Sequence, residues 1–311
     1  MRYTNLNPAA VPKTFREVRQ WRRDRSGRMK QKDYSYKVPV VAPDLAFLQG
    51  NAGEPTLTWI GHSTFLVQLA GLNIVTDPIW AEKLAHHTRL VPPGLAIADV
   101  PPIDVILISH SHYDHLNIAS LKRLTGSKML IVPIGLADKL RRKGFSSVIE
   151  LDWWQSAVIR GVTFTFVPAQ HWSRRTLTDT NSSRWGGFVL ERSNEPTIYF
   201  AGDSGYFDGF KQIGQRFADI DVALMPIGAY DPEWFMGPQH VTPEEALQAF
   251  RDTGARHFVP MHYGSYKLAD DTPREALDRL EAEIRRLRLK PGTVRVLPHG
   301  ETWRLNKEVK H

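Results

Sequence analysis

Cysteine is absent from all 311 residues of the chain. Disulfide bonds are therefore excluded, and any bound transition metal must be held by imidazole and carboxylate groups alone. No apolar run approaches the roughly 18 residues of a membrane-spanning helix, and residues 1–10 lack the apolar centre of a secretory signal. Low-complexity tracts and internal repeats are missing as well. We expect a globular protein of the cytoplasm, with peripheral contact to a membrane left open.

The formal net charge of +7 comes from one segment of the sequence, residues 13–32. This segment is rich in arginine and lysine, whereas basic and acidic residues balance in the rest of the chain. Phe15, Val18 and Trp21 recur every three residues within it, which predicts an amphipathic helix. Such a helix can contact anionic lipid headgroups, or it can pack on the protein with its arginines in solvent. Nucleic acid is not expected as a partner, because the basicity is confined to one terminal segment.

After residue 55 the sequence alternates between short apolar runs and helical patterns. The runs with the length and periodicity of β-strands are 56–60, 64–69, 72–75, 105–108, 129–132, 162–167, 197–200 and 222–225. Helices are predicted at 135–143, 242–253 and 272–288, and the last two begin with a Thr-Pro-x-Glu capping signature. This order predicts an α/β fold of two mixed sheets covered by helices. We expect residues 1–50 to be a basic extension that can be helical and residues 51–311 to be a single domain.

The strand at 105–108 leads directly into the sequence His110-Ser-His-Tyr-Asp-His115. At an extended strand end alternate residues face the same way, so His110 and His112 can bind one ion together. The chain must then turn, which lets Asp114 and His115 converge on a second point nearby. Ligands of α/β proteins usually sit at the carboxyl ends of strands. Chance clustering of three histidines within six positions is improbable when the whole chain has 12.

Three later strands each end in one more candidate ligand. His171 follows the strand at 162–167, Asp203 follows 197–200, and His262 follows the apolar residues 258–260. A single histidine after a strand is more often a hydrogen-bonded surface residue. Together with the first cluster, however, these residues predict a metal site between two sheets.

The order of these ligands resembles that of the metallo-β-lactamase superfamily, whose fold is a four-layer αβ/βα sandwich. Further stretches are similar to the family of N-acylphosphatidylethanolamine-hydrolysing phospholipases D, and the resemblance runs from about residue 56 to 305. These stretches are residues 58–64, 101–116, 150–154, 170–172, 175–177, 201–203, 226–230, 234–236, 239–240 and 299–301. Because many of them have no metal-binding role, this resemblance is more specific than the metal motif alone.

The resemblance implies two Zn²⁺ ions per chain with separate ligand sets and a shared carboxylate. The first set is His110, His112 and His171, the second is Asp114, His115 and His262, and the bridge is Asp203. Such a site leaves room for a bridging hydroxide, and two zinc ions can stabilise the oxygens of a phosphodiester under attack. The implied reaction is attack by that hydroxide on N-acylphosphatidylethanolamine, which yields N-acylethanolamine and phosphatidic acid.

Residues around the ligands have further expected roles. We expect His240 and Asp114 to be catalytic, with His240 reaching the leaving oxygen or the phosphoryl charge. A helix-entry histidine with a local hydrogen bond is the alternative for His240. Asp77 would accept an N–H from a ligand histidine, or it forms only an Asp-Pro turn; His62 is a further candidate for such a contact. Substrate contacts are expected from Tyr113, Trp172, Tyr230 and Gln239. The basic 173–184 loop can meet a phosphate headgroup or be a solvated loop.

Rival functions use parts of the same site. A lactonase or other ester or amide hydrolase would act with the same two zinc ions, with a carbonyl in place of phosphorus, and this is the main alternative. A β-lactamase is disfavoured by the bridging Asp203 and by the lack of a cysteine ligand. A nuclease is disfavoured because the chain lacks an obvious inserted domain. Diiron oxygen chemistry in related folds uses a glutamate where His112 stands. A binding module on an inactive hydrolase fold is disfavoured, because all seven ligand positions are filled.

Overall fold

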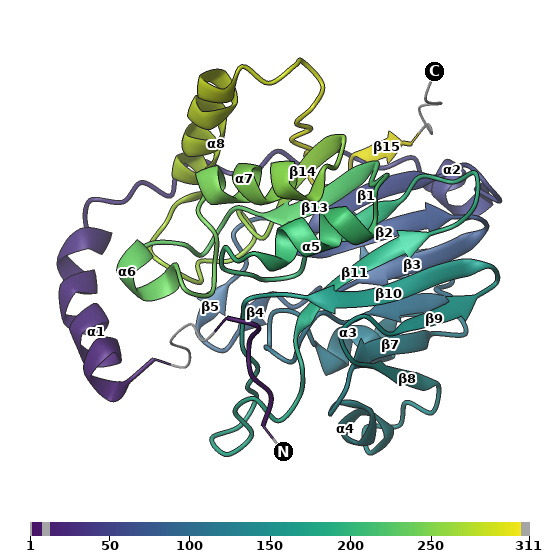
Figure 1. Ribbon diagram of the computed structural model, residues 1–311, viewed down its shortest axis with the longest axis horizontal. Coiled ribbons are helices and arrows are strands. Elements are labelled where there is room, and N and C mark those ends of the chain that lie inside the picture. Colours follow the sequence, from purple (N-terminus) through teal and green to yellow (C-terminus); the bar gives the residue numbers. More distant parts are fainter. Residues whose placement is uncertain (1, 8–12, 306–311) are drawn as a thin grey trace.

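The computed structural model describes residues 2–7 and 13–305, and it contains two large β-sheets that face each other (Figure 1). The first sheet has the strand order β15 (Thr302–Arg304), β1 (Thr56–Gly61), β2 (Thr64–Leu69), β3 (Leu72–Thr76), β6 (Val105–Leu107), β7 (Met129–Pro133) and β8 (Val148–Leu151). The second has the order β14 (His257–Met261), β13 (Val222–Pro226), β12 (Ile198–Phe200), β11 (Gly186–Glu191), β10 (Val162–Pro168) and β9 (Ser156–Ile159). A small hairpin pairs β4 (Lys83–Leu84) with β5 (His87–Thr88).

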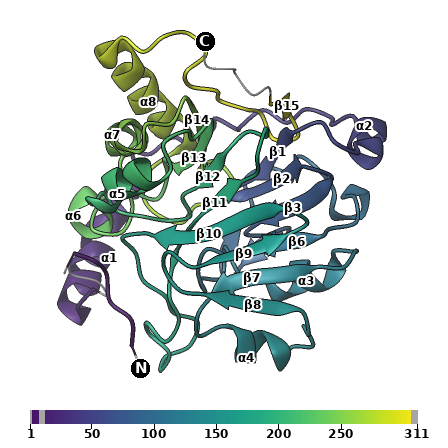
Figure 2. The ribbon, with the colours of Figure 1, turned by 45° about the vertical axis from the view of Figure 1, so that its right-hand side comes forward.

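Both sheets are mixed, as the sequence predicts. In the first sheet β1, β2 and β3 are antiparallel, whereas β3, β6, β7 and β8 run parallel. In the second sheet β9 to β12 are antiparallel and β12, β13 and β14 are parallel. Consequently β10, β12 and β14 all end at the same edge, so the residues that follow them can meet at one place (Figure 2).

Helices cover the outer faces of the sheets (Figures 1 and 2). Their bounds are α1 (Phe15–Met29), α2 (Leu45–Gly50), α3 (Ile118–Arg123), α4 (Ala137–Arg141), α5 (Gly209–Arg216), α6 (Glu233–Met236), α7 (Pro243–Thr253) and α8 (Pro273–Leu287), with a 3-10 turn at Ile97–Asp99. The capping signatures predicted at Thr242 and Thr272 are both present, because each threonine side chain accepts a hydrogen bond from the backbone of the glutamate three residues later.

The core explains the layered arrangement. Along β2, Phe65 and Val67 belong to the cluster between the two sheets, whereas Leu66 belongs to the cluster under α3 and α4. Alternate residues of a strand point to opposite faces, and both faces of this sheet are therefore buried. The expected fold of two mixed sheets flanked by helices is confirmed.

The basic segment 13–32 contains a helix, α1, which lies beside α6 (Figures 1 and 2). Trp21 stacks on Phe235 of α6 with ring centroids 5.2 Å apart. Arg25 and Arg28 both form ion pairs with the fully buried carboxylate of Asp270. This helix therefore packs on the body of the protein through Trp21 and two of its arginines.

Several elements were not predicted from the sequence. They are the strands β4, β5, β8, β9, β11 and β15 and the helices α2, α3, α5 and α6, and the helix predicted at 135–143 is shorter, spanning only Ala137–Arg141. Within residues 2–7 and 13–305, no helix combines the length and the apolar character that crossing a bilayer requires.

Candidate metal centre

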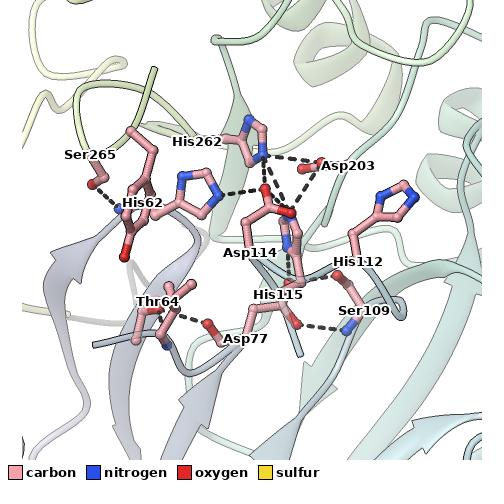
Figure 3. A network of polar contacts seen from close by, with 12 residues as sticks. His62, Thr64, Asp77, Ser109, His112, Asp114, His115, Asp203, His262 and Ser265 are labelled. Atoms are coloured by element: carbon pink, nitrogen blue, oxygen red, sulfur yellow. Dashed lines mark hydrogen bonds and ion pairs between the residues drawn. The ribbon is translucent and has the colours of Figure 1, made fainter. Parts of the chain in front are cut away.

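Four strand ends bring the seven predicted ligands together between the two sheets. Figure 3 shows His112, Asp114, His115, Asp203 and His262 among them. The loop after β6 carries four of the seven ligands, and the loops after β10, β12 and β14 carry one each. They are His110, His112, Asp114, His115, His171, Asp203 and His262. The segments lie far apart in the sequence, so only the packing of one sheet on the other can assemble this group.

The first ligand set converges through three ring nitrogens. His110 Nε2 lies 2.8 Å from His112 Nδ1, and His171 Nε2 lies 3.2 Å from the same atom. Zinc–nitrogen bonds of about 2.0–2.1 Å in a tetrahedral site place neighbouring ligand atoms roughly 3.3 Å apart. The three nitrogens therefore have the spacing of ligands around one ion.

The second set converges in the same way on one carboxylate oxygen. Asp114 Oδ2 lies 3.3 Å from His115 Nε2 and 3.4 Å from His262 Nε2. The two ring nitrogens are themselves 3.3 Å apart. These three separations match the same tetrahedral spacing, so the residues present fit a second ion.

Asp203 lies between the two sets. Its Oδ2 atom is 3.1 Å from the Nε2 atoms of both His115 and His262, and about 4 Å from two nitrogens of the first set (4.0 Å to His110 and 3.9 Å to His171). The other oxygen, Oδ1, is buried and has no hydrogen-bond partner among the described residues. A buried carboxylate without a partner is costly, so a cation shared by both sets would satisfy it.

Burial and charge set the protonation of the site. Burial lowers the pKa of His112 to about 3 and that of His171 to about 4, which keeps both rings neutral. Neutral imidazole is the form that binds metals. Burial would raise the pKa of Asp203, but His115 and His262 hold it well below its ordinary range. Three neutral nitrogens and a shared carboxylate form a donor set that suits zinc.

Hydrogen bonds fix the orientation of the ligand rings. Asp77 Oδ2 accepts a hydrogen bond from His115 Nδ1 at 2.6 Å, which turns the Nε2 atom of His115 toward the second set. Asp77 also accepts from the backbone N–H of Ser109 at 2.7 Å and from its hydroxyl at 2.5 Å. His171 Nδ1 donates to the carbonyl oxygen of Gln239 at 2.9 Å. Carboxylates and carbonyls in this position select the tautomer of a metal-binding histidine.

His62 lies against the second set, where the sequence offered it only as a further candidate. Its Nε2 atom is 3.0 Å from Asp114 Oδ2, the same oxygen that faces His115 and His262 (Figure 3). Burial lowers the pKa of His62 to about 3, so the neutral ring donates an N–H to the carboxylate. Its backbone N–H donates to Ser265 Oγ at 2.7 Å, which anchors this loop.

Two sets of side-chain contacts that sequence reasoning missed hold the ligand loops in place. Asn5 Nδ2 donates to the carbonyl oxygen of His171 at 2.9 Å, and Asn5 Oδ1 accepts from the backbone N–H of His171 at 3.1 Å. Arg175 Nη1 donates to the carbonyl oxygens of Ser111 at 2.8 Å and Leu116 at 2.7 Å. Both residues bind backbone groups of the ligand segments, and no sequence pattern predicts such contacts.

The predicted substrate residues lie in different places. Tyr113 and Trp172 line a cavity of about 530 Å³ that reaches the ligands His112 and Asp114. Gln239 is buried, and its carbonyl contacts His171. Tyr230 is only 3% exposed and packs against Arg279, so the structure does not bring it to this cavity.

His240 is buried beside the first set. Its Nδ1 atom lies 3.9 Å from Asp203 Oδ2, and its ring centroid lies 5.1 Å from that of His171. The Nδ1 atom has no hydrogen-bond partner within residues 2–7 and 13–305. This unpaired nitrogen faces the centre and not a local backbone group.

Fold and ligand geometry together define a class of protein. A family model described as the beta-lactamase superfamily domain matches residues 72–263. The chain belongs to the metallo-β-lactamase superfamily, and within it to the metal-dependent hydrolases.

Comparison with individual relatives places the chain more precisely within this superfamily. The N-acyl-phosphatidylethanolamine-hydrolyzing phospholipase D 1 of Caenorhabditis elegans is 37% identical over 268 residues, which are 79% of this chain and 74% of the relative. The mitochondrial phospholipase D of the same name from Saccharomyces cerevisiae is 37% identical over 236 residues, which are 72% of this chain but only 50% of the relative. A metallo hydrolase from Ignicoccus hospitalis has a similar structure, with a TM-score of 0.61, 27% identity and coverage of 80% of this chain and 97% of that one. The resemblance to the phospholipase D relatives is therefore confirmed.

Proposed function

We propose that this hydrolase holds two Zn²⁺ ions and cleaves a phosphodiester, with N-acylphosphatidylethanolamine as the substrate and N-acylethanolamine and phosphatidic acid as the products. The observation that carries the proposal is the position of Asp203 Oδ2, which faces three-ligand sets on both sides. The names of the nematode and yeast relatives support the choice of substrate.

The first ligand set would be His110, His112 and His171, and the second Asp114, His115 and His262, with Asp203 shared. When bound, such a pair of ions acidifies a water molecule and neutralises phosphoryl charge. The protein supplies fixed ligand directions through the contacts of Asp77 and Gln239, so little reorganisation is needed during the reaction.

His240 would act on the substrate directly, whereas Asp114 would act through the ion that it holds. The unpaired Nδ1 atom of His240 is placed to form a hydrogen bond with a phosphoryl oxygen or to give a proton to the leaving alcohol. The carboxylate of Asp114 is oriented by the N–H of His62, which lies 3.0 Å from its Oδ2 atom, the same oxygen that would hold an ion of the second set. Most of the group is buried, which strengthens these electrostatic contacts by excluding water, whereas His112 and Asp114 are half-buried beside the cavity.

The surroundings of the centre suit a lipid. The 530 Å³ cavity at the ligands shares Tyr113, Arg175 and Thr176 with an adjoining groove of about 600 Å³. That groove has apolar walls from Leu116, Ile118 and Leu140 and a basic rim that includes Arg142 and Lys143. An acyl chain beside an anionic headgroup matches this combination of apolar and cationic surface.

A product assay on a defined substrate panel tests the proposal. Zinc-loaded protein should cleave N-acylphosphatidylethanolamine and bis-p-nitrophenyl phosphate, and metal analysis should find about two zinc ions per chain. Asp203→Asn, which keeps the shape but removes the charge, should lower activity by at least about a hundredfold and release zinc. Hydrolysis of N-acyl lactones without any phosphodiester cleavage would contradict the proposed reaction and favour the lactonase alternative.

We also propose peripheral contact with anionic membranes through residues 13–32. Because Trp21 packs on Phe235, the contact would be made by exposed arginines such as Arg16 and Arg19, together with Phe15, which is 84% exposed. Arg16→Glu with Arg19→Glu should weaken co-sedimentation with vesicles that contain phosphatidylglycerol. Unchanged binding of that double variant would refute a role for this face of α1.

A further inference from the structure

A second basic site lies between α1 and the β4–β5 hairpin, on the side of the molecule that carries α1 (Figure 1). It is a groove of about 580 Å³, and none of the predicted metal ligands lines it. The side chains that carry charge or ring nitrogens into it are Arg22 and Arg25 from α1, His86 and His87 from the hairpin, and Lys267 from the loop before α8. No carboxylate lines the groove.

Most of the N–H donors in the groove form no hydrogen bond or ion pair with other described residues. Arg25 donates through Nε to Asp270 at 2.7 Å, and both of its terminal nitrogens remain without a hydrogen bond among the described residues. Lys267 Nζ lies 3.9 Å from the centre of the Tyr34 ring and forms no ion pair within that part of the chain. Arg22 has neither a hydrogen bond nor an ion pair within residues 2–7 and 13–305. Convergent cationic donors without a carboxylate match an anion that has several acceptor oxygens.

The groove is held in shape by contacts outside it. Trp21 stacks on Phe235, and Arg28 pairs with the buried carboxylate of Asp270 at 2.8 Å. The first contact fixes α1 against α6, and the second fixes it against the loop that carries Lys267. Burial, and next the positive charge of Arg25, lower the pKa of Lys267, and the carboxylate of Asp270 offsets only part of this shift.

We propose that this groove binds a phosphate group, from either a soluble phosphate ester or an anionic lipid headgroup. The assignment does not depend on the catalytic reaction, because the groove shares no lining residue with the metal centre or its cavity. Met29 and Leu90 add apolar surface beside the donors, which an acyl or glycerol moiety next to the phosphate can cover.

Protection of Lys267 from acetylation gives a local readout for this site. Full-length zinc-loaded protein is treated with acetic anhydride, and mass spectrometry measures the labelling rates of Lys267 and of Lys37, an exposed lysine outside the groove. The probes are inorganic phosphate, and vesicles of phosphatidylcholine with and without phosphatidic acid. We expect slower labelling of Lys267, relative to Lys37, in the presence of phosphate, of phosphatidic acid vesicles, or of both.

A pair of matched variants separates this groove from general charge attraction. Arg22→Gln should raise the half-protecting phosphate concentration by about fivefold or more, because it removes a charged donor from the groove. Lys30→Gln removes one positive charge from an exposed position at the end of the same helix that does not line the groove, and it should change that concentration by less than about twofold. Protection by inorganic phosphate alone identifies a soluble ester as the ligand, and protection by vesicles alone identifies a headgroup. If neither phosphate nor the vesicles protect Lys267, or if the two variants have equal effects, the proposal is overturned.

Discussion

The side chain of Asn5 binds the backbone of His171, one of the predicted ligands, without reaching the metal centre itself. Removal of this contact should nevertheless weaken metal binding. The Asn5 side chain forms three hydrogen bonds: two with the backbone of His171 and one, at 2.8 Å, from the indole N–H of Trp185. The side chains of His171 and Trp185 are almost fully buried. Asn5 therefore fixes the backbone from which the third ligand of the first set projects.

The magnitude follows from these three bonds. Each contributes about 0.5–1.5 kcal/mol to stability, so Asn5→Ala should lower the free energy of unfolding by about 1.5–4.5 kcal/mol. Water can reach the half-buried position and satisfy part of the vacated groups, which favours the lower end of that range. Supporting contacts of metal ligands typically change metal affinity by about 10–100-fold, and the proposed zinc affinity should fall by a similar factor.

Competition with a chromogenic chelator measures the zinc affinity, and urea unfolding of the zinc-free protein measures the stability. Asn7→Ala is the matched control, because Asn7 is exposed and its side chain has no hydrogen bond within the described residues. His171→Ala should lose one zinc ion outright and so calibrates the assay. If Asn5→Ala binds both ions as tightly as the unaltered chain does, the positioning role of Asn5 is refuted.

Three further predictions concern the rest of the site. Asp77→Asn should weaken zinc binding by about 10–100-fold in the chelator assay, because the carboxylate no longer orients His115. Burial opposes ionisation of Asp179, but backbone N–H groups and Lys139 hold its pKa well below the ordinary value. The ionised carboxylate therefore stabilises the 173–184 loop above about pH 4, and this stabilisation is lost as the pH falls further. Asp179→Asn should speed hydrogen exchange of that loop at pH 7, and the difference from the unaltered chain should shrink only as the pH falls well below about 4. Chelation of the metal should lower Tm, because the ions bind the folded chain far more tightly than the unfolded one.

The meeting of the predicted ligands at one place could be predicted, because each lies in a loop that follows a buried strand. A strand fixes the direction of the residue at its end, and parallel strands end at one edge, so His171, Asp203 and His262 follow from sequence order alone. The contacts of Asn5 and Arg175 could not be predicted, because both bind backbone groups of segments far away in the sequence. Such contacts depend on tertiary packing and leave no local pattern.

The strand β11 shows a second reason why some elements could not be predicted from the sequence. It begins with Gly186 and Gly187, which weaken any prediction of a strand. A Cβ atom at Gly186 would lie 2.2 Å from the carbonyl oxygen of Val167, and one at Gly187 would lie 2.4 Å from that of Phe200. The neighbouring backbones approach too closely for a side chain, and the glycines are therefore required at the point where the second sheet meets the ligand loops.

Residues 1–50 were predicted as an extension of the domain, yet both of their described parts contact ligand-bearing segments. Asn5 binds the backbone of His171 after β10, and Arg25 and Arg28 bind Asp270 in the loop that continues from His262 after β14. Removing the extension would therefore disturb both proposed ligand sets as well as any membrane contact. A deletion that abolished vesicle binding could not separate these effects. Only point variants on the exposed face of α1, such as Arg16→Glu with Arg19→Glu, change the charge that faces solvent while leaving the contacts of Asn5 and Asp270 in place.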